Sequence, residues 1–386
     1  MTDLLERAGA ASRAGRPFIL KEGSYSSEDV QKLRDSCALW REGDVFAGQE
    51  EELFDHQHPE LLFDADRTTE LVRFRAERAD RGANGDWIYF PWSGVLLHAV
   101  SEHEFLSLRT SRNRIMVTSE EQTILYDVVV VIAGLSIGSN IALSLALSGI
   151  ARTLILCDFD ALDTTNYNRV LAPIWNHGVH KAENVAERLY ELNPYLDIHL
   201  VREGITTSSL EEVFATHQPH VIFDEMDDFE MKVRVRETAR KFQVPVLMVT
   251  NLGDSLLFDV ERYDESPPEP FNGLAGDAPQ RILAGQLSRA DGNRYAAQIV
   301  GIDNVPTRGL ESLPEIGHTL GGRPQLGATV MTGSGIAAYL VRRLALGMPL
   351  PSGRARVALP SALGFEDNEW QPSERRERAL ERLGLK

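Results

Sequence analysis

The sequence predicts an α/β protein with a doubly wound, Rossmann-like parallel sheet and a smaller N-terminal α+β module. Three observations support this fold class. From Tyr126 onward, short β-branched runs alternate with longer helical stretches, as in parallel sheets with helices on both faces. The first run turns into an apolar helix through the glycine-containing segment Gly134 to Gly138. With 43% hydrophobic and 25% charged residues, the composition is that of an ordinary globular protein.

The order of elements in the main domain follows from the hydrophobic pattern. Apolar runs of strand length predict buried parallel strands at 128–133, 153–157, 198–201, 221–223 and 246–249. Longer stretches predict helices at 139–148, 181–192, 208–217 and 230–242, then a closing helix at 332–346 and a charged amphipathic helix at 373–385. For the helix at 208–217 we expect a capping box formed by Ser208 and Glu211.

Composition divides the chain into three expected regions. Residues 1–108 are mixed in pattern, as in a small α+β module. Residues 109–350 are expected to hold the sheet, and their Pro- and Gly-rich stretch 266–323 is expected to be a long loop excursion. Residues 351–386 are expected to form a tail with a helix.

Charge and apolar runs exclude several classes of protein. The formal net charge of −17 argues against a nucleic-acid partner, because binding to phosphate backbones requires a basic surface. Apolar runs such as Val128 to Ile132 are far shorter than the ~20 residues that cross a bilayer. The first residues also lack a secretory signal, so we expect a cytoplasmic protein without membrane contact. The two cysteines, Cys37 and Cys157, exclude a disulfide framework and a four-cysteine zinc site.

A candidate phosphate site lies where the first predicted strand turns into a helix. Small residues at Gly134, Ser136, Gly138 and Ser139 would let a phosphate approach backbone N–H groups and the positive end of the helix dipole. Asp158 ends the next predicted strand, where an acidic side chain can bind ribose hydroxyls. This pattern fits NAD as well as ATP, and its structural alternative is a tight turn without a ligand.

Further motifs follow in a specific order. They are the acidic segment Asp158-Phe159-Asp160, the motif Asn166-Tyr167-Asn168-Arg169, a helix-opening Lys181, the pair Asn193-Pro194 and the aspartates Asp227 and Asp228. In this order and spacing the chain resembles the ThiF superfamily, which includes the ubiquitin-activating enzymes and the molybdopterin-synthase activating enzymes. The resemblance covers about residues 110 to 350 and begins with Arg112-Asn113-Arg114.

The resemblance implies an adenylating enzyme that uses ATP and Mg²⁺. Its nucleotide-binding residues would be Gly134, Ser136, Gly138, Ser139, Asp158, Asp160 and Asn166, with Asp158 on the ribose. Arg169 and Lys181 would hold the triphosphate, and Asp227 would hold the magnesium ion. Arg114 would reach into the active site of a second subunit, which implies a homodimer. Such charges suit the attack of a carboxylate on the α-phosphorus, because that step brings two anions together.

Departures from the superfamily pattern narrow the function further. Ala133, Leu135 and Ser136 stand where the superfamily often has glycine, and the paired Cys-x-x-Cys zinc motifs are absent. Cys157 is expected within a strand and Cys37 in the N-terminal module, so no cysteine is placed for thioester transfer. This profile resembles the branch that modifies ribosomally made peptides, such as the microcin C maturation enzyme and the enzyme that forms the bicyclic core of pantocin A. We favour the second comparison.

We therefore expect ATP-dependent adenylation of a carboxylate on a precursor peptide, followed by intramolecular attack with release of AMP, in peptide antibiotic biosynthesis. The alternatives are an NAD(P)-dependent oxidoreductase on the same fold and a non-catalytic nucleotide-binding protein. Taken singly, Arg169 and Lys181 are also compatible with ordinary surface residues. Asp227 or Asp228 is equally compatible with a helix cap.

Residues 1–108 are expected to recognise the peptide substrate. Strand candidates at 70–75 and 87–90 would pair with an extended peptide through backbone hydrogen bonds. We expect local positive charge, suited to an acidic leader peptide, from Arg73, Arg75, Arg78 and Arg81. The alternative is that this module only caps the dimer.

Overall fold

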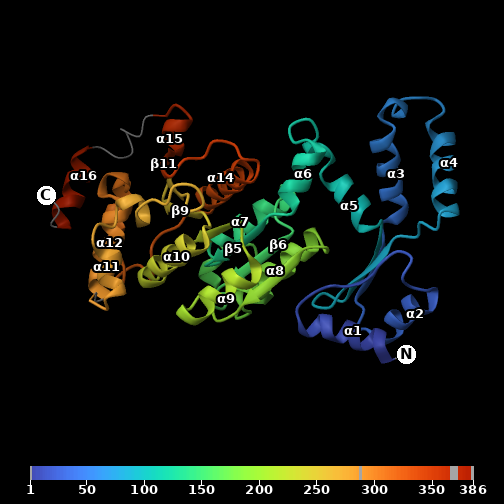
Figure 1. Cartoon of the computed structure of the whole chain (residues 1–386), viewed down its shortest axis with the longest axis horizontal. Helices are drawn as coiled ribbons and strands as arrows, with labels where there is room; N and C mark the ends of the chain where they lie inside the picture. Colours follow the sequence, from blue (N-terminus) through green and yellow to red (C-terminus); the bar gives the residue numbers. More distant parts are fainter. Residues whose placement is uncertain (1, 287–288, 366–372, 384–386) are drawn as a thin grey trace. The chain divides into compact units, whose positions relative to one another are not determined.

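The chain consists of two compact units (Figure 1). The computed structural model describes residues 2–286, 289–365 and 373–383. The N-terminal unit comprises Met1–Tyr126 and Ala186–Leu196, and the large unit comprises Asp127–Val185 and Asp197–Lys386. None of the described helices combines the length and the apolar composition that a membrane crossing demands.

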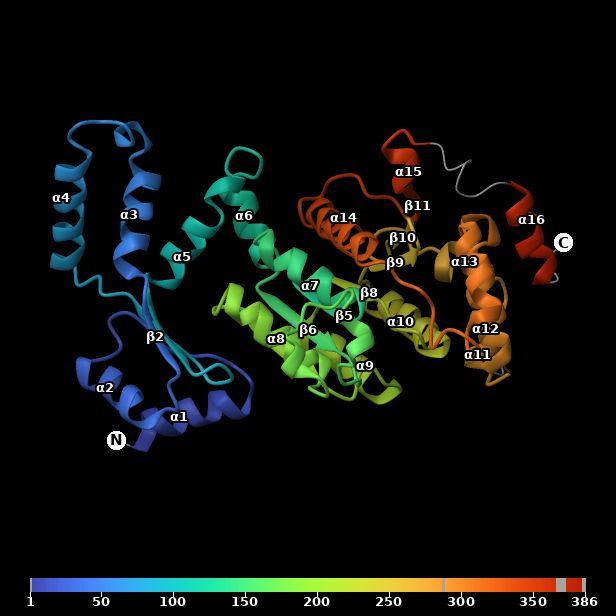
Figure 2. The ribbon, with the colours of Figure 1, turned by 180° about the vertical axis from the view of Figure 1, so that it is seen from behind.

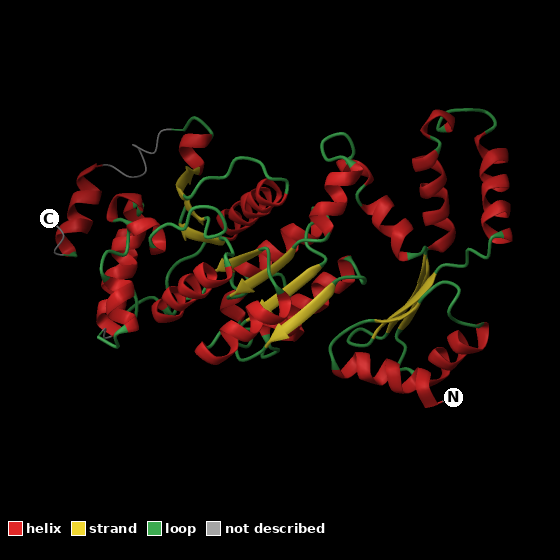
Figure 3. Cartoon of the chain, viewed as in Figure 1, coloured by secondary structure: helices red, strands yellow, loops and turns green. Residues whose placement is uncertain are grey.

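The large unit is built on a seven-stranded sheet (Figure 3). In spatial order its strands are β11 (Gly353–Ala358), β10 (Ser255–Glu261), β9 (Val246–Leu252), β8 (Val221–Asp224), β5 (Val129–Ala133), β6 (Thr153–Cys157) and β7 (Asp197–Val201). The strands from β9 to β7 are parallel, whereas β10 and β11 pair antiparallel. The predicted doubly wound sheet is confirmed, with an antiparallel edge that the sequence pattern did not reveal.

Helices cover both faces of this sheet (Figure 2). They are α7 (Ile137–Leu147), α9 (Thr207–His217), α10 (Phe229–Phe242) and α14 (Gly327–Ala345), together with α8 (Lys181–Leu192), whose residues are shared between the two units. Because side chains alternate across a strand, Val131 and Ile222 face α9 and α10, whereas Ile132 faces α7. The helices begin near their predicted positions, but the capping box of α9 is formed by Thr206 and Ser209 rather than by Ser208 and Glu211.

The described part of the stretch 266–323 contains several helices, which corrects the expected long loop. Its described helices are α11 (Ala278–Leu283), α12 (Arg289–Val300) and α13 (Thr307–Ser312), with the short 3₁₀ helices η5 (Pro270–Gly273), η6 (Ile302–Asn304) and η7 (Leu313–Glu315). Phe271, Ile282 and Tyr295 bury their side chains in one apolar cluster with Val233 of α10 and Met248 of β9. The apolar residues between the prolines and glycines therefore give this stretch a core of its own against α10. The chain then continues through α14, β11, α15 (Leu359–Ala362) and α16 (Ser373–Arg382).

The N-terminal unit contains a separate four-stranded sheet, which confirms the predicted smaller α+β module. Its order is β1 (Phe18–Leu20), β3 (Asp86–Phe90), β4 (Val95–Ala99) and β2 (Arg41–Asp44), and only the β2–β4 pair is parallel. The helices are α1 (Thr2–Arg13), α2 (Ser27–Ser36), α3 (Phe46–Gln57), α4 (Arg67–Asp80), α5 (Glu102–Arg109) and α6 (Ser119–Tyr126), with η1 (Pro59–Leu61) and η2 (Ser111–Asn113). The pair α1–α2 and the pair α3–α4 lie at opposite ends of this sheet (Figure 2).

One of the two strand candidates in this unit is wrong. Residues 70–75 lie within α4, where Leu71, Phe74 and Arg78 follow helical spacing and face α3 or the unit's interior. The candidate at 87–90 is confirmed as part of β3. However, β3 has a neighbour on each side, so its backbone is not open to an added strand.

The expected excess of positive charge is not created by the four arginines of the predicted surface, three in α4 and one at its C-cap. Each lies within ion-pair distance of a glutamate of the same unit, the pairs being Arg73–Glu70, Arg75–Glu51, Arg78–Glu50 and Arg81–Glu77. Arg78 also pairs with Glu104. Their charges are therefore matched within the fold, and an acidic peptide gains little attraction from them.

Candidate functional site

The turn between β5 and α7 depends on two glycines. Gly134 has φ +95°, and a Cβ atom there would lie 2.5 Å from the carbonyl oxygen of Glu225. A Cβ atom on Gly138 would lie 2.6 Å from Cγ2 of Ile132, so this glycine lets α7 pack closely on β5. The residues that suggested a phosphate loop are therefore needed first for the turn itself.

The N-terminus of α7 has no side-chain cap. Ser136 is the N-cap residue, but its side chain makes no capping hydrogen bond. Its Oγ accepts instead from Nε of Arg169 at 2.9 Å, and Ser139 Oγ donates to the Ser136 carbonyl at 2.8 Å. Uncapped N–H groups and the helix dipole make such an end a site for an anion.

Arg169 places a half-buried positive charge at this helix end. Besides Ser136, its guanidinium donates only to uncharged oxygens, those of Thr165 and Asn168. No carboxylate of the described residues lies within ion-pair distance of it. Burial lowers the pKa of Arg169, an effect that the charge of Asp227 opposes. A cation in this state is well suited to a negatively charged ligand.

The Asp158 carboxylate holds the turn together. Its Oδ2 accepts from the Leu135 N–H at 2.6 Å and its Oδ1 accepts from the Asp160 N–H at 2.8 Å. The residue is buried at the end of β6. Asp158 thus fixes the loops that follow both β5 and β6, and its contact with ribose stays a prediction.

Two further predicted residues are engaged within the fold. Lys181, the first residue of α8, is buried and its Nζ lies 2.7 Å from Oδ2 of Asp160. Asn166 accepts from the Asp163 N–H at 3.1 Å and completes a capping box on η3 (Thr164–Asn166). Lys181 therefore brings its own counter-charge to the candidate site.

The two aspartates after β8 have different environments. Asp228 is the N-cap of α10 and accepts from the Met231 N–H at 3.1 Å. Asp227 is exposed and forms no hydrogen bond or ion pair with any residue that the structure describes. Nowhere among the described residues do three His, Cys, Asp or Glu side chains gather as metal ligands. A free carboxylate beside a candidate phosphate site nevertheless fits Mg²⁺, which is commonly held by one or two carboxylates together with substrate phosphates.

Arg114 belongs to a different compact unit from these residues. It follows η2 in the N-terminal unit, whereas the others belong to the large unit. Its side chain is exposed, and the next residue, Ile115, has φ +74° and is 95% exposed. The role of Arg114 in a second subunit therefore stays a prediction.

Sequence reasoning missed Asn140, which positions Arg169. Its side chain is buried in α7, and its Nδ2 donates to the Arg169 carbonyl at 2.5 Å. The available signal was a lone amide in an otherwise apolar helix, since a buried polar side chain requires a partner.

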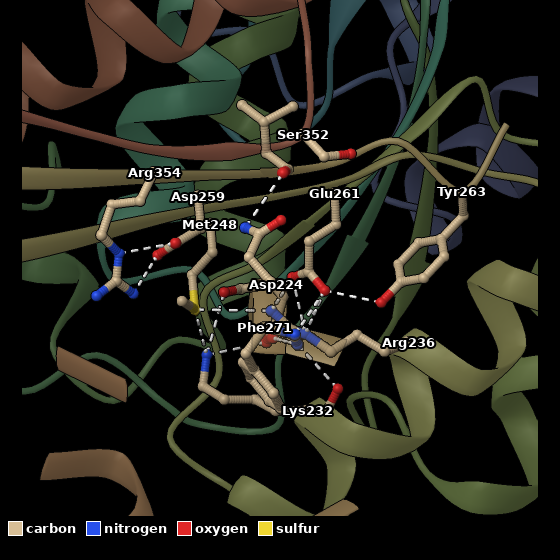
Figure 4. A network of polar contacts seen from close by, with 12 residues as sticks. Asp224, Lys232, Arg236, Met248, Asp259, Glu261, Tyr263, Phe271, Ser352 and Arg354 are labelled. Atoms are coloured by element: carbon tan, nitrogen blue, oxygen red, sulfur yellow. Dashed lines mark hydrogen bonds and ion pairs between the residues drawn. The ribbon is translucent and has the colours of Figure 1, made fainter. Parts of the chain in front are cut away.

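A buried ionic network next to the site was also missed (Figure 4). Arg236 of α10 is fully buried between Asp224, at 2.5 Å, and Glu261, at 2.8 Å. Lys232 also reaches Asp224, at 3.1 Å. Burial alone would raise the pKa of Asp224, but the charges and hydrogen bonds of Lys232 and Arg236 outweigh it and hold the pKa below its usual value. The network fixes the end of β8, three residues before Asp227.

Comparisons with known proteins point to the family that the sequence motifs suggested. Residues 110–256 match the ThiF family. An uncharacterized protein of Mycobacterium tuberculosis is 38% identical over 288 residues, covering 74% of this chain and 40% of the relative, so the chain spans well under half of that protein's length. The tRNA threonylcarbamoyladenosine dehydratase of Bacillus subtilis is 25% identical over 201 residues, covering 51% of this chain and 75% of the relative.

Solved structures with a similar fold include PaaA and MccB. PaaA is 19% identical with a TM-score of 0.46, over 66% of this chain and 68% of that chain. MccB of Escherichia coli, crystallised with ATP, is 16% identical with a TM-score of 0.45, over 79% of each chain. The sequence motifs and the family match agree, and the chain carries a ThiF-family domain at residues 110–256.

Proposed function

We propose that the large unit binds ATP with Mg²⁺ and activates a carboxylate as its adenylate. One observation carries this proposal. At the uncapped N-terminus of α7 lies the half-buried guanidinium of Arg169, and no carboxylate in the described part of the chain is within ion-pair distance of it. A helix end and a free cation at one place favour an oligophosphate. The ThiF-family match over the same residues supports ATP as that ligand.

In the proposed reaction, a carboxylate oxygen attacks the α-phosphorus of ATP. A carboxyl–phosphate anhydride forms, the bond from the α-phosphorus to the bridging oxygen breaks, and pyrophosphate leaves. Arg169 and Lys181 would bind the triphosphate and neutralise the charge that develops during this step. Asp158 would contact the ribose, and Asp227 would hold Mg²⁺, which supplies further neutralisation of phosphate charge.

For the acyl substrate we propose a precursor peptide whose own nucleophile then displaces AMP, in peptide antibiotic biosynthesis. The cysteines support a route without an enzyme thioester. Cys157 lies in β6, where burial raises the pKa of its thiol and leaves it unreactive. Cys37 belongs to the N-terminal unit, and burial raises its pKa as well.

Peptide recognition by the N-terminal unit remains part of this proposal, but at a different strand. The edge strands of its sheet are β1 and β2. The strand β2 is mostly exposed, and Trp40, directly before it, is 79% exposed. An extended peptide would pair with the free edge of β2 and pack against Trp40. Replacing Trp40 by Ala should weaken peptide binding and leave ATP binding unchanged. Equal peptide affinity would remove β2 as the docking strand.

The decisive experiment measures pyrophosphate release from ATP with candidate peptides. Release that depends on a peptide supports the proposal. Release only with tRNA that carries threonylcarbamoyladenosine would instead favour the activity named for the Bacillus subtilis relative, although the net charge of −17 weighs against a tRNA partner. Calorimetry tests the oxidoreductase alternative, since NAD binding tenfold tighter than that of ATP would exclude adenylation. Tight ATP binding without pyrophosphate release would favour a non-catalytic protein.

The proposed homodimer has its own test. If Arg114 acts in the partner's site, mixing Arg114→Ala chains with Asp227→Ala chains should restore part of the activity through hybrid dimers with one intact site. Absence of restoration despite proven subunit exchange would show that Arg114 does not act across subunits.

A further inference from the structure

Two polar side chains in the large unit have enclosed atoms for which the described residues provide no hydrogen-bond partner. The Nδ2 and Oδ1 atoms of Asn251, on β9, and the Oγ1 atom of Thr329, on α14, are enclosed and bond to no described residue. Thr329 is fully buried. Unpaired buried polar atoms are rare in folded proteins, because they lose their hydrogen bonds to water without replacement. Their presence here requires an explanation.

These two side chains lie on facing surfaces of α14 and β9. A Cβ atom on Gly333 would lie 3.1 Å from Cγ1 of Val249, so α14 and β9 are in close contact at this point. Asn251 lies two residues beyond Val249 and therefore points to the same face of the sheet. Thr329 lies one helical turn before Gly333 and therefore on the same face of the helix.

Both lie toward the edge of the sheet that carries the candidate site. A Cβ atom on Gly327, the first residue of α14, would lie 2.3 Å from the Asn168 carbonyl, next in sequence to Arg169. The Asn168 side chain also donates to the Gln325 carbonyl at 2.8 Å. The helix therefore starts beside the Arg169 loop and runs antiparallel to β9, which brings Thr329 and Asn251 to the same level near that loop.

The start of α14 offers a further attraction for an anion. The helix is 19 residues long, its N-cap Leu326 provides no side-chain cap, and its first turn contains no acidic residue. Its positive end thus favours a carboxylate. This end lies on the Asn168 side of Arg169, whereas the end of α7 meets Arg169 at Ser136.

We propose that Asn251 and Thr329 form the acyl subsite of the adenylation centre and bind an amide group next to the carboxylate that is activated. This inference rests on the proposed function and specifies its substrate class as peptidic. An asparagine amide donates and accepts at once, so it matches the C=O and N–H of a peptide group. The Thr329 hydroxyl supplies a further donor or acceptor from α14, which packs on β9. A substrate without the amide would leave these atoms unpaired.

The test uses two adenylate analogues that differ only in the amide. Both are 5′-O-(N-acylsulfamoyl)adenosines, one with an N-acetylalanyl group and the other with a 2-methylpentanoyl group, and their dissociation constants are measured by calorimetry. Wild-type protein should bind the amide analogue at least about tenfold more tightly. Asn251→Leu and Thr329→Val should each reduce this preference and leave the affinities for ATP and for the 2-methylpentanoyl analogue unchanged.

Equal affinity of the wild type for the two analogues, with ATP still bound, would overturn the subsite and leave the adenylation proposal intact. Absence of binding by ATP and by both analogues would instead refute adenylation itself. A matched control is Ser334→Ala, because this hydroxyl in the same helix is equally buried but donates to the Val330 carbonyl at 2.9 Å. It should leave the preference unchanged.

Thermal unfolding provides a second readout that needs no ligand. Thr329→Val removes an unpaired hydroxyl and should hold or raise the unfolding temperature, whereas Ser334→Ala removes a bonded hydroxyl and should lower it. If Thr329→Val lowers the temperature as much as Ser334→Ala, the Thr329 hydroxyl is already satisfied within the fold and the subsite is wrong.

Discussion

Replacing Arg236 by Met should destabilise the large unit by about 3 kcal/mol. The change leaves Asp224 and Glu261 fully buried without the cation that lies 2.5 and 2.8 Å from them. Loss of one member of a buried ion pair costs about 3–5 kcal/mol. We expect the lower end of this range, because Lys232 still reaches Asp224 at 3.1 Å and the Tyr263 hydroxyl still donates to Glu261 at 2.7 Å. The methionine side chain fills most of the vacated volume, so cavity formation adds little.

The loss should depend on pH in a defined direction. In the wild type the pKa of Asp224 is held below its usual value, so this group contributes stability that is present at neutral pH and is lost only as the pH falls through its folded-state pKa. Without Arg236, burial acts against a weaker positive charge and the pKa of Asp224 moves upward. The ionised carboxylate then destabilises the variant most at high pH. The difference between wild type and variant should therefore narrow as the pH falls from 8 to 5.

Urea unfolding at both pH values measures this difference. The matched control is Arg234→Met, a residue of the same helix whose guanidinium pairs at 2.8 Å with Glu230 in an exposed i,i+4 pair. Such a pair contributes within about 0.5 kcal/mol, so the control should unfold almost as the wild type does. A loss below about 1 kcal/mol for Arg236→Met at pH 8, or a loss that grows toward pH 5, would refute the argument that the network stabilises the end of β8.

Three other changes test the turn, the metal site and the thiol. Gly134→Ala should cost about 2 kcal/mol or more of stability, because Gly134 has φ +95° and lies against the Glu225 carbonyl. Gly335→Ala should instead add about 0.5–1 kcal/mol, because a Cβ atom at this position of α14 meets open space. Urea unfolding measures both, and equal changes in stability for the two variants would contradict this prediction. Asp227→Asn should weaken the binding of Mg²⁺–ATP, measured by calorimetry, by at least about tenfold. The affinity for metal-free ATP and the free energy of unfolding should stay unchanged, since the residue is exposed. An unchanged affinity for Mg²⁺–ATP would remove Asp227 from the metal site. Cys157→Ala should lower stability by about 1 kcal/mol, because it leaves a small cavity in the core, but it should preserve pyrophosphate release. If the variant folds but no longer releases pyrophosphate, the thiol has a role in the reaction.

The parallel part of the fold could be predicted because its strands are apolar throughout. Residues 129–133 and 153–157 are buried on both faces, so their pattern is a continuous apolar run between helices. The strand β10 is equally buried, yet it contains Asp259 and Glu261. Their partners are Arg354 and Arg236, which lie 95 and 25 positions away in the sequence. The sequence around β10 does not show these distant partners. Its two acidic residues therefore made this buried strand look like an exposed segment.

The pattern of apolar and polar residues at 70–75 led to a wrong strand prediction, again because a buried charge has partners that are distant in the sequence. Leu71 and Phe74 fit a strand over six residues, but over fourteen they fit the helix Arg67–Asp80, whose buried Arg78 is neutralised by Glu50 and Glu104. A charged residue on the inner face of a helix hides the helical period until its ion-pair partners are known.

The gathering of the candidate residues could also be predicted, because the ends of parallel strands meet at one edge of the sheet. Gly134, Asp158 and Asp227 follow β5, β6 and β8 in this way. Which residue bonds to which could not be predicted. Asp158 holds the Leu135 N–H, and Lys181 holds Asp160, although the sequence offered each as a free ligand for the nucleotide.

The charges at the site separate into those that the fold satisfies and those that it does not. Lys181 is paired with Asp160, and Asp228 caps α10. Arg169 has no carboxylate within ion-pair distance among the described residues, and Asp227 has no cation there, although the two are close enough for Asp227 to oppose the burial-driven fall in the pKa of Arg169. A ligand that satisfies both must carry anionic oxygens for the guanidinium and a cation for the carboxylate. A nucleotide polyphosphate with a bound divalent metal supplies both, whereas a dinucleotide without a metal leaves Asp227 unmatched.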